Sequence, residues 1–198
     1  MTDRYQALPH YTMEHSARVE QRMVNRATDV SLDDSAIKVM TDLQQTTPFN
    51  IEPTASIDAT NDKMIACGVR LLFVTDSEEK LLGIVTYTDI WGEKPVQYMK
   101  EHGGSREDIL AQDIMTAKDN LDVLNLSDVQ KATVGDLIKT MSELGRQHTL
   151  VVENSATGES TIRGILSTSQ ISRQVGIPIE PSLRANTFAD VERALISA

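Results

Sequence analysis

Apolar residues recur at helical spacing in some segments of this chain and form short unbroken runs in others. Together these two patterns predict a mixed α/β fold. The clearest helical pattern covers residues 134–144, where apolar side chains recur mostly at three- or four-residue intervals and Gly145 follows as a cap. The members of this apolar face are Val134, Leu137, Ile138, Met141 and Leu144. A second helix is predicted over residues 54–67, ending at Gly68, with an apolar face made by Ile57, Met64 and Ile65.

Short, nearly unbroken apolar runs indicate buried strands between these helices. Such runs lie at 69–74, 81–85, 149–152 and 161–166, and shorter strands are expected at 48–51 and 121–126. Polar turns separate the paired runs, at 76–80 and 154–159. Helices are expected to follow at 88–99, with Pro95 limiting its length, and at 169–175, ending at Gly176.

Three more helices are predicted outside these groups. Residues 31–43 begin with Ser31 and Asp34 at the spacing of a capping box. Residues 13–26 carry a few apolar side chains at helical spacing, and a clearer amphipathic helix begins at Thr187 in the tail. The tail helix would dock on its own module, on a second subunit or on a partner.

One stretch of sequence has a second, similar copy. The first copy is Gly83-Ile84-Val85-Thr86-Tyr87-Thr88-Asp89, and the second is Gly164-Ile165-Leu166-Ser167-Thr168-Ser169-Gln170. Upstream, Gly68 and Gly145 are 77 residues apart, whereas Gly83 and Gly164 are 81 apart, which fits a longer turn in the second copy. Val39-Met40-Thr41 likewise resembles Ile114-Met115-Thr116. Two copies indicate two related subdomains and are too few for a solenoid.

Each copy of the motif joins an apolar strand to a helix through a hydroxyl and, three residues later, an acid or amide. Thr86 with Asp89, and Ser167 with Gln170, have the spacing of a capping box, which by itself only starts a helix. The alternative is that Asp89 also accepts hydrogen bonds from a vicinal diol such as a ribose. Gln170 would do so more weakly, because bonds to a charged acceptor are stronger.

The order of these motifs, present twice between Val39 and Val175, resembles that of a cystathionine-β-synthase (CBS) domain pair, also called a Bateman module. The resemblance implies two β-α-β-β-α repeats in a pseudo-twofold arrangement, here flanked by N- and C-terminal helices. We expect an N-terminal extension at 1–38, repeats at 39–100 and 113–176, a linker at 101–112 and a helical tail at 177–198.

The resemblance also implies where an adenosine-containing ligand would bind. In the first copy it points to Thr47, Pro48, Phe49, Arg70, Leu71, Thr86 and Asp89. In the second copy it points to His148, Ser167 and Gln170, with Asp122, Arg146 and Gln147 nearby. The family's ribose-binding acid falls on Asp89 in the first copy but on Gln170 in the second, which favours the first site.

Several of these residues have a structural explanation as well as a functional one. Arg70 would pair with a ligand phosphate or with a carboxylate such as Asp89, because a cation in an apolar strand needs a partner. Phe49 would stack on adenine or fill a core. His148 would contact a phosphate when protonated or remain a neutral cap. Trp91 would wall a pocket or pack in a core or an interface.

Composition narrows the class of protein. A net charge of −10 argues against a nucleic-acid partner, which requires a basic face. No apolar run reaches the roughly 20 residues needed to cross a bilayer, and the N-terminus lacks a signal-peptide core, so we expect a cytoplasmic protein without a membrane partner. Cys67 stands alone and is expected to pack, and the four scattered histidines show no metal-ligand spacing.

We therefore predict a regulatory protein that senses AMP, ADP, ATP, S-adenosylmethionine or NAD and passes occupancy to a protein partner. No catalytic residues, metal or cofactor are expected, and the resemblance implies a homodimer. The alternative is a ligand-free structural dimerisation or adaptor module, for which the two capping boxes suffice. A weaker third hypothesis is a small enzyme acting on a nucleotide.

Overall fold

The structure is a computed structural model, and it describes residues 30–155, 160–177 and 179. The helices predicted at 13–26 and after Thr187, like His10 and His15, lie outside this part of the chain.

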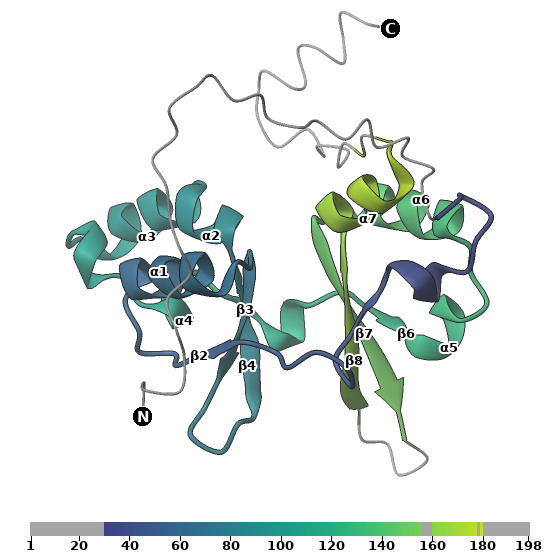
Figure 1. Cartoon of the computed structure of the whole chain (residues 1–198). Helices are drawn as coiled ribbons and strands as arrows, with labels where there is room; N and C mark the ends of the chain where they lie inside the picture. The colour runs from purple at the N-terminus through teal and green to yellow at the C-terminus, as the bar shows by residue number, and fades with distance from the viewer. Residues whose placement is uncertain (1–29, 156–159, 178, 180–198) are drawn as a thin grey trace, which may run out of the picture.

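The described chain forms two lobes, each a four-stranded sheet with helices packed on it (Figure 1). The first lobe contains α1 (Ile57–Cys67), α2 (Tyr87–Trp91), α3 (Lys94–His102), η2 (Arg106–Asp108), α4 (Ala111–Ile114), β2 (Asn50–Ile51), β3 (Leu71–Thr75), β4 (Leu81–Thr86) and β5 (Thr116–Ala117). The second contains η1 (Ala36–Val39), α5 (Leu126–Val129), α6 (Val134–Leu144), α7 (Thr168–Val175), β1 (Thr41–Asp42), β6 (Val123–Asn125), β7 (His148–Asn154) and β8 (Ser160–Ser167). η3 (Lys118–Asn120) connects the lobes between β5 and β6. This is the predicted α/β architecture.

The two halves share one topology. The strand orders are β2-β3-β4-β5 and β1-β8-β7-β6, with one parallel pair and two antiparallel pairs in each sheet. Leu71 pairs with Thr86 in the first lobe and His148 pairs with Ser167 in the second. These pairs reproduce the offsets of 77 and 81 residues read from the sequence, so the predicted duplication is confirmed.

Each sheet takes one short strand from the start of the other repeat. β1 pairs with β8, and β5 pairs with β4. The crossing explains the glycine that opens each repeated motif: a Cβ on Gly83 would collide with the backbone oxygen of Thr116, and one on Gly164 would collide with the side chain of Met40. The two lobes therefore differ from the two sequence repeats, because the first strand of each repeat lies in the sheet of the other lobe.

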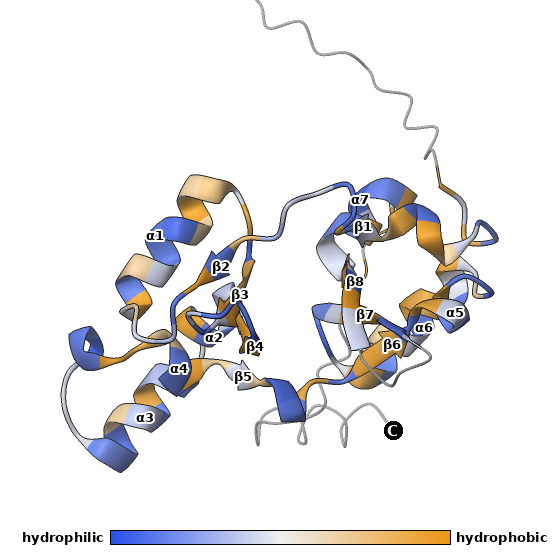
Figure 2. Ribbon diagram, turned by 90° about the horizontal axis from the view of Figure 1, so that it is seen from below, coloured by the Kyte–Doolittle hydropathy of each residue, from blue (hydrophilic) through white to orange (hydrophobic). Residues whose placement is uncertain are grey.

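The strands bury side chains on both faces, and alternate residues enter different clusters. From β3, Leu72 and Val74 join the first-lobe core, whereas Leu71 and Phe73 join Ile84 and Leu150 in a cluster between the sheets. Figure 2 shows hydrophobic residues along β3 and β4 of the first lobe and β8 of the second. Because Leu150 belongs to β7, this inter-sheet cluster holds the two repeats together.

The best-patterned helices form as predicted. The Ser56 side chain caps α1 and Gly68 ends it in the left-handed conformation, with a φ of 67°. Helix α6 begins with a capping box between Thr133 and Asp136 and ends at Gly145, with a φ of 63°. One face residue was assigned wrongly: Ile65 is 69% exposed, so α1 buries Ile57 and Met64 without it.

The helix predicted at 31–43 is wrong. The Asp34 carboxylate accepts a hydrogen bond from the Ser31 amide at 2.8 Å, as expected, but only the short η1 follows. The next residues are extended, because Thr41 and Asp42 pair with β8. Pairing with a sequence-distant strand therefore overrides the local helical pattern.

The single helix predicted at 88–99 is two helices. α2 ends at Gly92, and α3 starts two residues later with Pro95 in its first turn. Proline has no amide hydrogen to donate and suits a helix start, so Pro95 begins the second helix instead of limiting the first. This break directs Lys94 back toward Asp89.

Candidate functional site

Three segments that the family resemblance groups around a ligand meet at one end of the first sheet. The carbonyl of Phe49 accepts from the amide of Phe73 at 3.0 Å, which holds segment 47–49 beside β3. The carbonyl of Arg70 accepts from the amide of Tyr87 at 2.9 Å, and Leu71 pairs with Thr86. The entry to β2, the entry to β3 and the start of α2 therefore form one corner.

The first repeated motif forms the predicted capping box. Asp89 Oδ2 accepts from the Thr86 amide at 2.8 Å and from Thr86 Oγ1 at 2.6 Å. The Thr86 hydroxyl oxygen accepts in turn from the Asp89 amide at 3.4 Å. The Asp89 carboxylate is thus oriented by the helix start, with its side chain 12% exposed.

The other carboxylate oxygen has a partner that the sequence analysis missed. Lys94 Nζ lies 2.7 Å from Asp89 Oδ1, and it also donates to the carbonyl of Ile114 at 2.8 Å and to Thr116 Oγ1 at 3.3 Å. The signal was weak, because a lysine five residues after the acid lies off the helical i, i+4 spacing. Only the break at Gly92 brings the two side chains together.

Arg70 has a different environment from the one expected. It lies just before β3, is exposed, and holds its guanidinium carbon 5.9 Å from the centre of the Tyr87 ring. Within the described residues it makes no ion pair, so of the two alternatives considered, a ligand phosphate or a carboxylate such as Asp89, the pairing with Asp89 is absent. Its charge remains available to an anion.

The segment entering β2 is open to solvent. Thr47 and Pro48 are exposed, and Phe49 is 39% exposed. Phe49 therefore does not fill a core, which was the alternative to stacking on adenine. Leu71, in contrast, is buried in the inter-sheet cluster and contributes packing.

The second motif does not repeat the capping box. Ser167 Oγ lies 3.0 Å from Ser169 Oγ and makes no side-chain cap on α7. Gln170 Oε1 accepts instead from Thr41 Oγ1 of β1 at 3.1 Å. The second capping box predicted from spacing is therefore wrong, because the neutral amide is held by the exchanged strand.

The rest of the second corner also departs from the first. Asp122, at the position corresponding to Phe49, lies 3.4 Å from Arg146 Nη2, and both side chains are exposed. Gln147 stands where the first repeat has Arg70, since its carbonyl accepts from the Thr168 amide as that of Arg70 does from Tyr87. The second corner therefore has no counterpart of the Asp89 carboxylate and no counterpart of the unpaired Arg70 guanidinium.

His148 links the two corners. It opens β7, and its pKa is lowered to about 4 by burial and then by the nearby positive charge of Arg70, against an opposing effect of Asp89. A side chain of the second repeat is thus within electrostatic range of Arg70 and Asp89 of the first. His148 is therefore neutral at pH 7.

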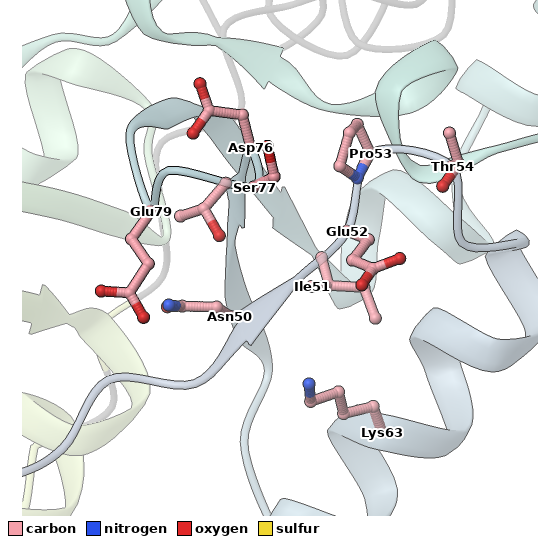
Figure 3. A pocket seen from close by; sticks show the side chains of 10 residues that line it. Asn50, Ile51, Glu52, Pro53, Thr54, Lys63, Asp76, Ser77 and Glu79 are labelled. Atoms are coloured by element: carbon pink, nitrogen blue, oxygen red, sulfur yellow. The ribbon is translucent and has the colours of Figure 1, made fainter.

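A hollow of about 550 Å³ lies elsewhere in the first lobe (Figure 3). Its lining residues are Asn50, Ile51, Glu52, Pro53, Thr54, Lys63, Thr75, Asp76, Ser77 and Glu79. It is formed at the carboxyl ends of β2 and β3, whereas the Asp89 corner is at their amino ends. None of the predicted ligand-binding residues lines it, so it is separate from the Asp89 corner.

A metal site, a membrane-spanning helix and a disulfide each have requirements that the described residues do not meet. Across residues 30–155, 160–177 and 179, no group of three or more histidine, cysteine or acidic side chains is arranged to hold a metal ion. No helix in that same part of the chain is both long and apolar enough to cross a membrane. Cys67 is a free thiol of intermediate exposure at the last position of α1.

Comparison with known proteins identifies the fold. Residues 37–90 match the family model described as the CBS domain, and no curated protein matches the sequence. An uncharacterized conserved protein from Pyrococcus horikoshii is similar over 73% of this chain and 93% of its own, with 22% identity and a TM-score of 0.51. The CBS-domain protein NE2398 is similar over 71% of this chain and 96% of its own, with 21% identity and a TM-score of 0.50. Residues 37–90 are therefore similar to the CBS domain, and the described part of the chain has the fold of a tandem CBS-domain pair.

Proposed function

We propose that this protein is a regulatory sensor of an adenosine-containing small molecule of the AMP, ADP, ATP, S-adenosylmethionine or NAD type. The observation that carries the proposal is the convergence at one corner of an oriented carboxylate, Asp89, and an unpaired guanidinium, Arg70, with His148 of the other repeat close by. A carboxylate accepts hydrogen bonds from a ribose diol, and a guanidinium pairs with phosphate or another anionic group.

In this proposal each residue has a separate task. Asp89 receives the ribose hydroxyls, and Thr86 fixes the carboxylate through its amide and hydroxyl. Arg70 receives the phosphate or carboxylate of the ligand. Phe49, with its exposed ring at the entry to β2, offers a face on which adenine stacks, and Thr47 and Pro48 shape that entry.

The first corner is proposed to bind more tightly than the second. Gln170 is neutral and is bonded to Thr41, and Ser167 bonds Ser169, so neither is oriented as its counterpart in the first motif is. Asp122 adds negative charge where the first corner has Phe49, which disfavours an anionic ligand.

Sensing requires that the ligand favour one arrangement of the repeats over another. His148 of the second repeat is within electrostatic range of Arg70 and Asp89, so in this proposal a ligand bound at these two residues acts across the surface between the repeats. We propose that occupancy changes the angle between the repeats or between subunits of a homodimer, and that a protein partner reads this change. The role is regulatory and non-catalytic, and the proposed ligands are cytoplasmic metabolites, so we place the protein in the cytoplasm.

Calorimetry with AMP, ADP, ATP, S-adenosylmethionine and NAD tests the proposal. The informative variant is Asp89→Asn, which keeps the side-chain shape and removes the charge; we expect roughly tenfold weaker binding of the preferred ligand. Asp136→Asn is the matched control, because Asp136 closes a capping box of the same kind on α6. Equal affinity of Asp89→Asn and wild-type protein would remove Asp89 from the site.

A second function is favoured by the contacts that Asp89 already makes within the protein. Lys94 and Thr86 already occupy both oxygens of Asp89, as expected of a residue that only stabilises the fold. The protein would then be a ligand-free dimerisation or adaptor module. Flat calorimetry with all five compounds, together with no thermal shift, would favour this function over sensing.

A further inference from the structure

The ammonium of Lys94 joins three segments of the first lobe. Its three acceptors are Asp89 Oδ1 at the start of α2, the carbonyl of Ile114 at the end of α4, and Thr116 Oγ1 in β5. An ammonium has three N–H donors, so this set uses all of them. Ile114 is buried in the first-lobe core, and Thr116 belongs to the strand that the second repeat contributes to the first sheet.

The second lobe holds the corresponding strand without a charge. Thr41 of β1 donates directly to Gln170 at 3.1 Å. Counting from the paired residues Thr86 and Ser167, the position of Lys94 is taken by Val175, which is buried in the second-lobe core. Thr41 thus contacts the motif residue Gln170 directly, whereas Thr116 is connected to the motif residue Asp89 only through Lys94.

We propose that Lys94 is the residue that sets the affinity of the Asp89 corner and couples its occupancy to the exchanged strand β5. This inference rests on the proposed function and assigns the regulation of that site. A ribose diol needs free lone pairs on the Asp89 carboxylate. Oδ2 already accepts two hydrogen bonds from Thr86 and Oδ1 is taken by the ammonium of Lys94, so only one of the roughly four acceptor sites of the carboxylate is free. A diol that donates both hydroxyls must therefore displace the ammonium from Oδ1, because the two Thr86 donors are fixed by the helix start.

The competition has a structural consequence. When a diol takes Oδ1, the ammonium loses its one charged partner and keeps two neutral acceptors, the Ile114 carbonyl and the Thr116 hydroxyl. Bonds to a charged partner are the stronger ones, so the hold of Lys94 on β5 weakens. β5 is only Thr116–Ala117, and the Lys94 contact adds to its pairing with β4, so loosening this contact transmits occupancy to the connection between repeats.

The test uses Lys94→Met, with Lys100→Met as the matched control on the exposed side of the same helix. The probe is adenosine, which carries the diol and no phosphate, so the loss of a positive charge does not penalise it directly. We expect Lys94→Met to bind adenosine about fivefold more tightly than wild type, as the release of a partly exposed ion pair predicts, and Lys100→Met to match wild type.

Hydrogen exchange of the amides of Thr116 and Ala117 supplies a second readout. Adenosine is expected to speed exchange there in wild-type protein, and Lys94→Met is expected to exchange fast without ligand and to show no further change. Binding by Lys94→Met alone would also support the inference, because it would show that Lys94 masks the site.

Two results would overturn the inference in distinguishable ways. If wild-type protein binds adenosine and Lys94→Met binds it equally or more weakly, the proposed function stands and the role of Lys94 falls. If neither protein binds adenosine, AMP or S-adenosylmethionine, the proposed function falls and takes the coupling with it.

Discussion

At the scale of single residues, this protein shows how one side chain acquires a role only when a distant segment arrives. In the sequence, Gly83 is a strand residue of low β-propensity. In the structure, its lack of a side chain allows β5 to pair closely with β4. His148 looks like a surface histidine at a strand start, yet it lies beside charges of the other repeat.

Replacement of Gly83 by alanine is expected to destabilise the fold by about 2 kcal/mol, because the new Cβ would press on the backbone of Thr116, which cannot move without breaking the strand pair. Urea unfolding measures the change. The control is Gly135→Ala in α6, where the nearest atom lies 3.4 Å away; a helical alanine should there be neutral or slightly stabilising. Equal stability of both variants would show that β5 does not press on Gly83.

Acid is expected to weaken the protein through His148. Its folded-state pKa of about 4 lies below the ordinary value of 6.5, so between these values the unfolded chain binds more protons. The contribution is fully present above pH 6.5 and is lost as pH falls toward 4; it amounts to about 1–3 kcal/mol. His148→Gln should flatten the dependence of unfolding free energy on pH across this window, and His102→Gln, at an exposed site, should not.

At the scale of elements, the exchanged strands are the least regular and the most informative parts. β1 and β5 contain two residues each, too few to persist without side-chain contacts. Arg163 of β8 supplies such a contact for β1, with Nη1 2.6 Å from Asp42 Oδ1 and Nε 3.0 Å from Glu153 Oε2. For β5, the corresponding side-chain contact is the hydrogen bond from Lys94 to Thr116 Oγ1, which adds to the pairing with β4.

Arg163→Met is expected to lower the thermal midpoint more than Arg146→Met does. The Arg163 side chain is half-buried and pairs with two carboxylates, whereas Arg146 forms one exposed contact of 3.4 Å with Asp122. The pKa of Asp42 is lowered by the Gln44 backbone amide and then by Arg163, so the contribution of Asp42 is lost as pH falls through that depressed value. Equal midpoints for the two variants at pH 7 would mean that Arg163 does not hold β1.

At the scale of the whole molecule, the helical surface of the first lobe carries exposed apolar side chains. The first lobe exposes Ile65 on α1, Trp91 on α2 and Val96 on α3, and Trp91 Nε1 donates to Asn61 of α1 at 3.0 Å. Trp91 therefore lies on an outer helical face, not in a core. We propose this face as the surface through which a homodimer forms.

Ile65→Glu is expected to shift the protein from dimer to monomer, because it places a charge on that face at a residue 69% exposed. Light scattering during gel filtration measures the mass. Val123→Glu, at an exposed apolar residue of the second lobe, is the control and should remain dimeric. A wild-type monomer, or a dimeric Ile65→Glu, would contradict the assignment.

Most elements of the fold followed from local pattern, except the helix predicted at 31–43 and the break at Gly92, and the site followed only in part. The helix at 134–144 and its cap could be predicted because periodicity, capping box and glycine all agree. The capping box of Asp89 could be predicted from spacing, but the same spacing failed at Gln170, where Thr41 of another strand competes. Lys94 could not be predicted, because its contact depends on the break at Gly92.

By itself, the sequence determined that two related α/β units occur in tandem, since apolar period, glycine caps and a duplicated motif are local properties of the chain. Only the tertiary structure decided which strands the lobes exchange, which cation neutralises Asp89 and which cation stays unpaired. The physical reason is that strand pairing and ion pairing join residues far apart in sequence, and their choice depends on the packing of the whole chain.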